Sequence, residues 1–278
     1  MLRFTFLSEN KTEKAICRAE FGLSIFIEKD GKKILFDTGY SDLFSDNADA
    51  LGVDLSSVDF CVISHGHMDH TEGVPKFCSI NKDAPVYLHK DALYPAYGTT
   101  DGEIDDYNCG IVWPDEVREG LMPRFIFTDG VVKITDDIIV SGSIPSSPDF
   151  EPAEDFYRKL PAGDLIPDTM SHEQFLAIRD EGGIYLFSGC SHKGIIAAVE
   201  YAKQLFPGEP IAAVVAGMHL MNATDEMREK VIDKLYDEAP DLVLPMHCTG
   251  LKAIVMFKEK FGDRCILPSV GKTYSFGA

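Results

Sequence analysis

The stretch Ser64-His65-Gly66-His67-Met68-Asp69-His70 places three histidines and one carboxylate within six consecutive residues, directly after an apolar run. Neutral imidazole nitrogens together with a carboxylate oxygen are the donor set of catalytic zinc and iron sites. Gly66 allows the chain to turn sharply enough for two imidazoles to approach one ion. The stretch therefore predicts a metal site with His65, His67, Asp69 and His70 as candidate ligands. The alternative is a solvated histidine-rich loop without an ion.

Histidines recur where other predicted strands end. Apolar runs stop at Cys190-Ser191-His192, at Met218-His219 and at Met246-His247, so six of the eight histidines lie in such loops. The carboxyl ends of strands in α/β sheets line one crevice, and these side chains are therefore expected to converge. His89 ends a strand without a motif and is expected to be structural or supporting. His172 lies in an irregular span and stays undecided.

The order of the predicted elements indicates the architecture. Apolar alternation predicts strands at 2–7, 22–27, 33–36, 58–64, 85–89, 124–128 and 131–140, with a short helix at 41–51. The C-terminal third alternates strands at 184–188, 211–216 and 241–246 with helices at 194–206 and about 225–238. Strands followed by βαβα units predict two sheets packed between outer helices. With no linker and no low-complexity tract, we expect a single domain over residues 1–278.

Residues 94–123 interrupt this regular succession of predicted strands and helices. They contain several glycines, prolines and acids and the single tryptophan, and they show no clean periodicity. Such excursions are usually functional, so we expect a lid over the metal crevice, with 149–172 as a second candidate segment. Aromatic side chains with a polar tip suit a ring-bearing ligand. The candidate substrate contacts are Tyr94, Tyr97, Tyr107 and Trp113.

Composition limits the partners and the compartment. The net charge of −19 argues against nucleic acid, whose phosphates require a basic surface, and leaves a small-molecule substrate. No run approaches the roughly 18 apolar residues of a membrane span, and the N-terminus shows no targeting signal. Seven cysteines without a CxxC pair indicate a reducing compartment, so a cytoplasmic protein is expected. The oligomeric state is not predicted.

The pattern His65-x-His67-x-Asp69-His70 resembles the HxHxDH signature of the metallo-β-lactamase superfamily, and Phe36-Asp37-Thr38-Gly39 resembles its first motif. The resemblance implies an α/β (α+β) fold, a four-layer αββα sandwich with one or two transition-metal ions at the sheet edge. Zinc is the first choice, with iron or manganese as alternatives. His65 and His67 would hold the first ion, and Asp69 and His70 the second. Asp69 would also be the catalytic base, Asp37 would support a ligand, and His247 would match the ligand of the fifth motif.

Later motifs narrow the resemblance to one subgroup. Gly189-Cys190-Ser191-His192, Gly217-Met218-His219-Leu220 and His247-Cys248-Thr249-Gly250 resemble the subgroup named after an archaeal 7,8-dihydropterin-6-ylmethyl-4-(β-D-ribofuranosyl)aminobenzene-5'-phosphate synthase.

Two positions depart from the common superfamily pattern. Ser143 stands where most superfamily hydrolases have a ligand histidine, and Cys190 stands where they have a bridging aspartate. We expect Cys190 to bind or bridge metal, with an inert buried thiol as the alternative. Either His192 or His219 would replace the missing histidine, and His219 is a candidate for a metal or a substrate contact.

Three functions follow from the resemblance and the departures. The first is a metal-dependent enzyme that acts on a small anionic or ring-bearing, pterin-related metabolite, as a transferase would. The second is a metallohydrolase of esters, lactones or phosphodiesters. The third is a non-catalytic metal-binding protein, which the two departures keep open.

Overall fold

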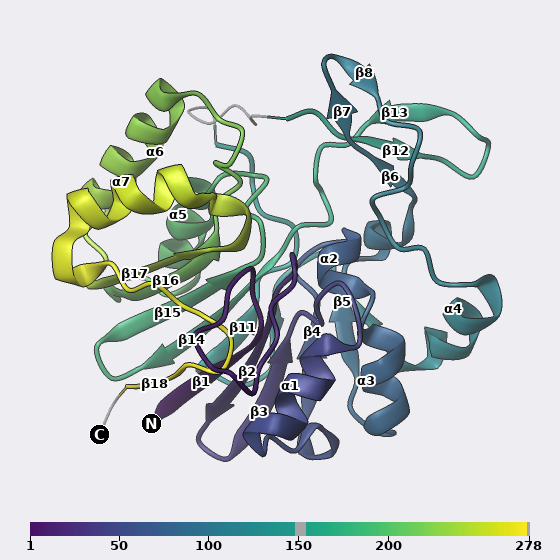
Figure 1. Cartoon of the computed structure of the whole chain (residues 1–278), viewed down its shortest axis with the longest axis horizontal. Helices are drawn as coiled ribbons and strands as arrows, with labels where there is room; N and C mark the ends of the chain where they lie inside the picture. Colours follow the sequence, from purple (N-terminus) through teal and green to yellow (C-terminus); the bar gives the residue numbers. More distant parts are fainter. Residues whose placement is uncertain (148–153, 277–278) are drawn as a thin grey trace.

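Two β-sheets packed face to face form the centre of the molecule, and helices cover both outer faces (Figure 1). The structure is a computed structural model that describes residues 1–147 and 154–276. The seven-stranded sheet has the order β18 (Thr273–Phe276), β1 (Leu2–Ser8), β2 (Ser24–Lys29), β3 (Lys32–Phe36), β4 (Phe60–Val62), β5 (Val86–Leu88) and β9 (Phe125–Phe127). The six-stranded sheet has the order β10 (Val132–Lys133), β11 (Ile138–Val140), β14 (Phe175–Asp180), β15 (Gly183–Ser188), β16 (Ile211–Gly217) and β17 (Leu242–Met246).

Apolar side chains on alternate strand positions fill the space between the sheets. Phe4 and Phe36 of the first sheet meet Phe187 of the second, and all three are fully buried. The rings of Phe4 and Phe187 contact edge to face with centroids 5.2 Å apart. A one-residue slip of a strand would turn these side chains away from the space between the sheets, so this core also fixes the pairing.

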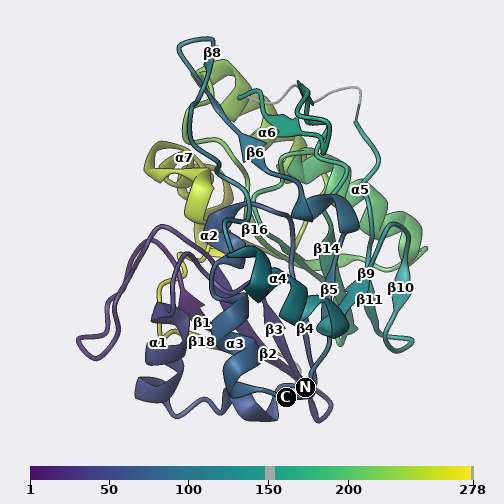
Figure 2. The same ribbon diagram turned by 90° about the vertical axis from the view of Figure 1, so that its right-hand side faces the viewer.

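The outer faces of the sheets are covered by two helical layers, as Figures 1 and 2 show from two sides. Helices α5 (Ile195–Leu205), α6 (Asp225–Asp237) and α7 (Leu251–Phe261) pack on the six-stranded sheet. Helices α1 (Leu43–Leu51) and α3 (Val74–Ile80) pack on the seven-stranded sheet. The predicted four-layer αββα sandwich is therefore confirmed. Among the described residues, no helix is long and apolar enough to cross a membrane.

The β2–β3 hairpin illustrates how local sequence sets the fold. Only Asp30 and Gly31 connect the two strands, and both have positive φ angles, of 49° and 81°. Two-residue hairpins favour such turns because their twist matches that of the strands, and Asp-Gly adopts them readily. The Asp30-Gly31 dipeptide therefore sets the connection between β2 and β3.

The irregular segments contain more structure than the sequence indicated. Residues 94–123 include α4 (Asp115–Leu121), the short strand β6 (Ala96–Tyr97) and the hairpin of β7 (Thr99–Thr100) and β8 (Glu103–Ile104). The segment after 153 forms the hairpin of β12 (Tyr157–Lys159) and β13 (Leu165–Pro167), and β12 pairs with β6. The sequence predicted none of these elements, because elements of two to seven residues are too short to show a period. Residues 149–153 of the second candidate lid lie outside the described chain.

The strand directions bring the histidine-bearing loops together. Strands β15, β16 and β17 are parallel, and they end at Ser188, Gly217 and Met246, directly before the loops that carry His192, His219 and His247. In the other sheet, β4 is parallel to β3 and β5 and ends just before the 64–70 stretch. The metal-binding candidates therefore lie at one edge of the sandwich.

Candidate metal centre

Three imidazoles form the first donor group. The Nε2 atoms of His65, His67 and His192 are buried, and none has a hydrogen-bond partner in the part of the chain that the structure describes. The ring centroids of His65 and His67 lie 4.6 Å apart, and those of His65 and His192 lie 4.9 Å apart. Buried polar atoms normally have partners, so three unpaired nitrogens in one place indicate a missing common ligand.

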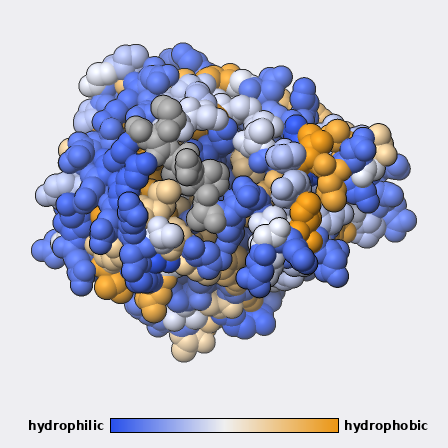
Figure 3. Space-filling view, turned by 90° about the horizontal axis from the view of Figure 1, so that it is seen from above, coloured by the Kyte–Doolittle hydropathy of each residue, from blue (hydrophilic) through white to orange (hydrophobic). Residues whose placement is uncertain are grey.

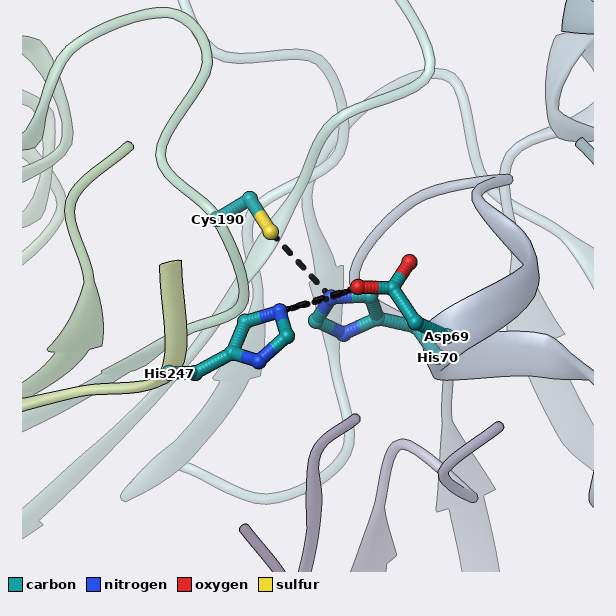
Figure 4. Close-up of side chains that lie close together, drawn as sticks. All are labelled: Asp69, His70, Cys190 and His247. Atoms are coloured by element: carbon teal, nitrogen blue, oxygen red, sulfur yellow. Dashed lines mark hydrogen bonds and ion pairs between the residues drawn. The ribbon is translucent and has the colours of Figure 1, made fainter. Parts of the chain in front are cut away.

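The second donor group consists of Asp69, His70, Cys190 and His247, shown in Figure 4. Nε2 of His70 lies 3.2 Å from both Nε2 of His247 and Sγ of Cys190, and Oδ2 of Asp69 lies 3.0 Å from Nε2 of His247. Ligands bound to one zinc ion at about 2.0–2.3 Å stand at similar separations from each other. The arrangement fits a first-row transition-metal ion.

Cys190 lies between the two donor groups. Its Sγ belongs with Asp69, His70 and His247, and also with His65 and His192, in both cases with all ligand atoms within 4.8 Å of one another. The side chain is 3% exposed. A thiolate at this point can serve both positions, as expected for a residue that replaces a bridging aspartate, and its softness favours zinc or iron over magnesium or calcium.

Burial sets the protonation of the first group. Desolvation, helped by the neighbouring histidines, lowers the pKa values of His65 and His192 well below the ordinary value. It also lowers the pKa of His67 to about 3. All three rings are therefore neutral at physiological pH, which is the state that binds metal.

The second group concentrates negative charge around His70. Burial disfavours a charge on this ring, but Asp69 and Asp37 outweigh burial and raise the pKa of His70 to about 9. Although burial opposes it, the histidines around Asp69 hold the pKa of that carboxyl below its usual range. Two carboxylates that stabilise a proton on His70 would equally stabilise a metal cation competing for the same nitrogen.

Asp37 lies behind the site and orients it, where the resemblance implies a supporting residue. Its Oδ2 accepts a hydrogen bond from Nδ1 of His70 at 2.7 Å and one from Oγ of Ser64 at 2.8 Å. Its Oδ1 accepts from the backbone N–H of Ser64 at 2.7 Å. These bonds direct Nε2 of His70 towards the donor group, a common arrangement of carboxylates behind metal-bound histidines.

Two supporting residues, Asn10 and Glu173, were not predicted from the sequence. Oδ1 of Asn10 lies 3.0 Å from Nδ1 of His247, which leaves Nε2 of that ring for the donor group. Glu173 is fully buried and accepts hydrogen bonds from the backbone N–H groups of His192 and Lys193 at 2.6 and 2.7 Å. Neither residue lies near a recognisable motif, so the sequence contains no signal for them.

His172, which the sequence left undecided, and His89, expected to be structural or supporting, both have structural roles in this arrangement. Nδ1 of His172 accepts a hydrogen bond from the backbone N–H of Gly66, and its Nε2 lies 3.3 Å from Asp168. His89 caps a short 3-10 helix by accepting from the backbone N–H of Asp91. His172 therefore steadies the loop between His65 and His67.

A cavity of about 550 Å³ opens in front of the donor groups. Its lining comprises Phe21, Tyr40, His67, Met68, Asp69, Tyr107, Cys109, Glu154, Phe156, Cys190, His192, His219, Met221, Asn222 and Cys248. Aromatic and apolar side chains dominate, and none of these described lining residues is lysine or arginine. This volume and lining are typical of a site for a small organic molecule. Seen from above, most of the surrounding surface is hydrophilic (Figure 3).

Four aromatic residues were expected to contact substrate from the lid. Among the lining residues that the structure describes, only Tyr107 is one of these four. Trp113 is 7% exposed and packs against Phe125 under the seven-stranded sheet, so the expectation that it contacts substrate was wrong. Tyr94 stacks on Arg158, and Tyr97 pairs with a neighbouring strand. Both residues are half-buried in the short elements of their segment, outside the cavity lining.

Phe156 is an aromatic residue that the sequence analysis did not single out. The centroid of its ring lies 4.7 Å from that of the His67 ring and 5.0 Å from that of the His192 ring.

The position of the missing ligand histidine is occupied by Ser143, whose hydroxyl donates a hydrogen bond to the backbone carbonyl of Ser171. The structure brings His192 into the first donor group, whereas Nε2 of His219 is paired with Glu154 at 2.7 Å.

Comparison with known proteins agrees with this geometry. Residues 17–193 match the family described as the metallo-beta-lactamase superfamily. The chain therefore belongs to the metallo-β-lactamase superfamily, as the HxHxDH resemblance implied.

Individual relatives narrow the superfamily to a subgroup. Over 268 residues the chain is 30% identical to the 7,8-dihydropterin-6-methyl-4-(beta-D-ribofuranosyl)-aminobenzene-5'-phosphate synthase of Methanocaldococcus jannaschii, covering 93% of this chain and 90% of that protein. It is 33% identical over 246 residues to an uncharacterized protein of the same organism, covering 87% and 88%. A crystal structure described as a metal-dependent hydrolase of the beta-lactamase superfamily aligns over 100% of both chains with a TM-score of 0.85 and 27% identity. The predicted subgroup resemblance is confirmed.

Proposed function

We propose that the protein is a metal-dependent enzyme that transfers a group to or from a small, anionic, ring-bearing metabolite related to a pterin. One observation carries the proposal: Cys190 lies between two donor groups at the base of a largely apolar cavity. Ions bound there would neutralise the charge that develops on a departing anionic group. The relative named as a dihydropterin synthase, 30% identical over 93% of this chain, supports the choice of a pterin-related metabolite.

The cavity lining supports both halves of this substrate description. Phe21, Tyr107 and Phe156 offer flat apolar surface that suits a ring. An anionic group would find no lysine or arginine among the lining residues that the structure describes, so the metal positions are its natural partners. The substrate would therefore bind with its anionic end at the base of the cavity and its ring between the aromatic walls.

Cys190 favours group transfer over hydrolysis. A thiolate gives more negative charge to bound ions than a carboxylate does, which makes the site a weaker activator of water. Surrounding side chains keep the donors in place: Asp37 orients His70, Asn10 orients His247 and Glu173 holds the loop of His192. These residues position and desolvate the reacting groups rather than exchange protons with them.

A metallohydrolase is the second candidate. It is supported by the solved structure described as a metal-dependent hydrolase, which superimposes over the whole of both chains. The two candidates differ in whether water is the acceptor. A hydrolase would act on simple esters, lactones or phosphodiesters, whereas the proposed transferase would need a specific second substrate.

The test is a comparison of substrates on the metal-loaded protein. Generic chromogenic esters, lactones and phosphodiesters are assayed beside a pterin-methyl diphosphate with an aryl amine. We expect weak turnover of the generic set and formation of a new carbon–nitrogen bond with the pair. Fast, metal-dependent hydrolysis of the generic set would refute the transferase proposal in favour of a hydrolase. The His67→Ala variant is the inactive control.

A further inference from the structure

Beside the two donor groups lies a third one that uses different residues. Sγ of Cys190, Sγ of Cys248 and a ring nitrogen of His219 all lie within 4.8 Å of one another. All three residues line the cavity, and Cys190 and Cys248 are each 3% exposed. Only Cys190 is shared with the groups described above, so His219 and Cys248 have no role in the two positions implied by the superfamily.

The hydrogen bonds of His219 are those of a metal ligand. Its Nε2 is held by Oε2 of Glu154 at 2.7 Å, and its Nδ1 is buried without a hydrogen-bond partner in the described chain. Histidines that bind metal usually donate their other ring N–H to a carboxylate, which fixes the tautomer. Because Nε2 is engaged by Glu154, Nδ1 is the ring nitrogen of His219 that is open to an ion.

The backbone of His219 and the hydrogen bonds of Cys248 also hold these three residues together. His219 has a φ of 46°, in the left-handed region that a residue with a side chain rarely adopts. Its backbone N–H donates to Sγ of Cys248 at 3.3 Å, and Sγ of Cys248 donates in turn to the carbonyl of Cys190. Strained conformations persist at sites where the surroundings demand them, and here the strain brings the nitrogen and both sulfurs together.

We propose that Cys190, His219 and Cys248 form a third metal position, suited to a thiophilic ion such as zinc. Two sulfurs and one imidazole are softer than the donors of the other two groups, so this position selects soft ions more strongly. Cys190 would be the shared ligand, whereas His219 and Cys248 would serve this position alone. Because all three side chains line the cavity, a ligand that enters the cavity can reach an ion bound there.

The experiment counts ions with cobalt(II) as the probe. Chelator-stripped full-length protein is dialysed against cobalt(II), and bound cobalt is measured together with the near-ultraviolet absorption of thiolate bound to cobalt. We expect three ions per chain in the wild type. Cys248→Ser should lose one ion and part of the thiolate band, and the serine hydroxyl can still accept the hydrogen bond from His219. His219→Asn, which changes a different strand end, should lose the same ion.

Cys109→Ser is the matched control, because Cys109 lines the same cavity but belongs to none of the donor groups. It should keep the wild-type ion count and absorption. Two ions in the wild type, with count and band unchanged in Cys248→Ser and His219→Asn, would overturn the third position. That result would leave the two other positions and the proposed function intact, since these depend on His65, His67, His70 and His247.

Discussion

Three neutral imidazoles pointing at one place are the residue-scale basis of the site. Leaving a buried polar atom without a partner costs about 1–3 kcal/mol, so three unpaired Nε2 atoms are costly for the metal-free fold. His65 is further held by a 2.9 Å contact between its Nδ1 and the hydroxyl of Ser64. An ion that satisfies all three nitrogens would remove this cost.

The clearest residue-scale prediction concerns His67. His67→Ala should weaken metal binding by more than about 100-fold, because losing a ligand exceeds the 10–100-fold effect of losing a supporting contact. Elemental analysis of protein purified without chelators provides the measurement. His89→Ala is the control, since it removes a helix cap worth about 1 kcal/mol and should leave metal content unchanged. Wild-type metal content in His67→Ala would exclude this histidine as a ligand.

At the residue scale, the sequence predicted candidate site residues that are close together in the chain and missed contacts between residues that are far apart in it. His65, His67, Asp69 and His70 are close in the chain, so their common site was recognisable. The contact of Asn10 with His247 joins residues 237 positions apart and follows no spacing rule. The choice between His192 and His219 depended on how two loops turn, which only the fold determines.

At the scale of elements, the strand-end loops must be held rigidly for their histidines to converge. Glu173, just before β14, accepts two backbone N–H bonds from the loop that follows β15. Glu173→Gln can accept only one of them without turning its amide towards a donor. We expect a loss of about 1–3 kcal/mol in the free energy of unfolding, measured with urea, and weaker zinc binding.

Glu181→Gln is the matched control for this prediction, because Glu181 is exposed at the turn between β14 and β15. It should change the free energy of unfolding by less than about 0.5 kcal/mol. Equal stability and equal zinc affinity of Glu173→Gln and Glu181→Gln would show that the carboxylate does not hold the His192 loop.

The segment that carries β6 to α4 gives a second element-scale prediction. Tyr107 is 58% exposed and lines the cavity, whereas Trp113 is buried under the neighbouring sheet. Tyr107→Ala should weaken binding of a free pterin, followed by its fluorescence, with little change in stability. Trp113→Ala should instead cost about 3–5 kcal/mol of stability. If Tyr107→Ala binds the pterin as tightly as the wild type, this segment does not contact the ring.

Elements with a clear period were predictable, and the others were not. The alternation in β1 and the helical face of α5 gave bounds within one residue of those observed. By contrast, α4 has seven residues and none is fully buried, so it shows no apolar stripe. The sequence patterns also predicted neither β14 nor α7, although both contribute to the core of the second sheet.

At the scale of the whole molecule, stability should depend on pH through the buried histidines. The pKa of His67 is about 3 in the folded state and near 6.5 when unfolded, so the unfolded chain binds more protons between these values. In this window each such histidine lowers stability by up to about 1.4 kcal/mol per pH unit as the pH falls. His65 and His192 have lowered pKa values and add in the same direction.

We therefore expect the chelator-treated protein to lose stability steadily between pH 7 and pH 4 in urea unfolding experiments. His67→Asn, which cannot take up a proton, should show a smaller slope. Stability that is independent of pH over this range would contradict the buried, neutral state of these rings. The pKa of His70 is shifted in the opposite direction, so its stabilising contribution is complete below about 6.5 and is lost as the pH rises from there through about 9.

We infer that this fold holds metal ions on both sides of Cys190. Anomalous diffraction at the metal absorption edge, from crystals of protein purified without chelators, tests it most directly. We predict one peak where Nε2 of His65, His67 and His192 converge, and another among Asp69, His70 and His247, with Sγ of Cys190 next to both. Crystals that diffract well but show no anomalous peak at either position would contradict the account.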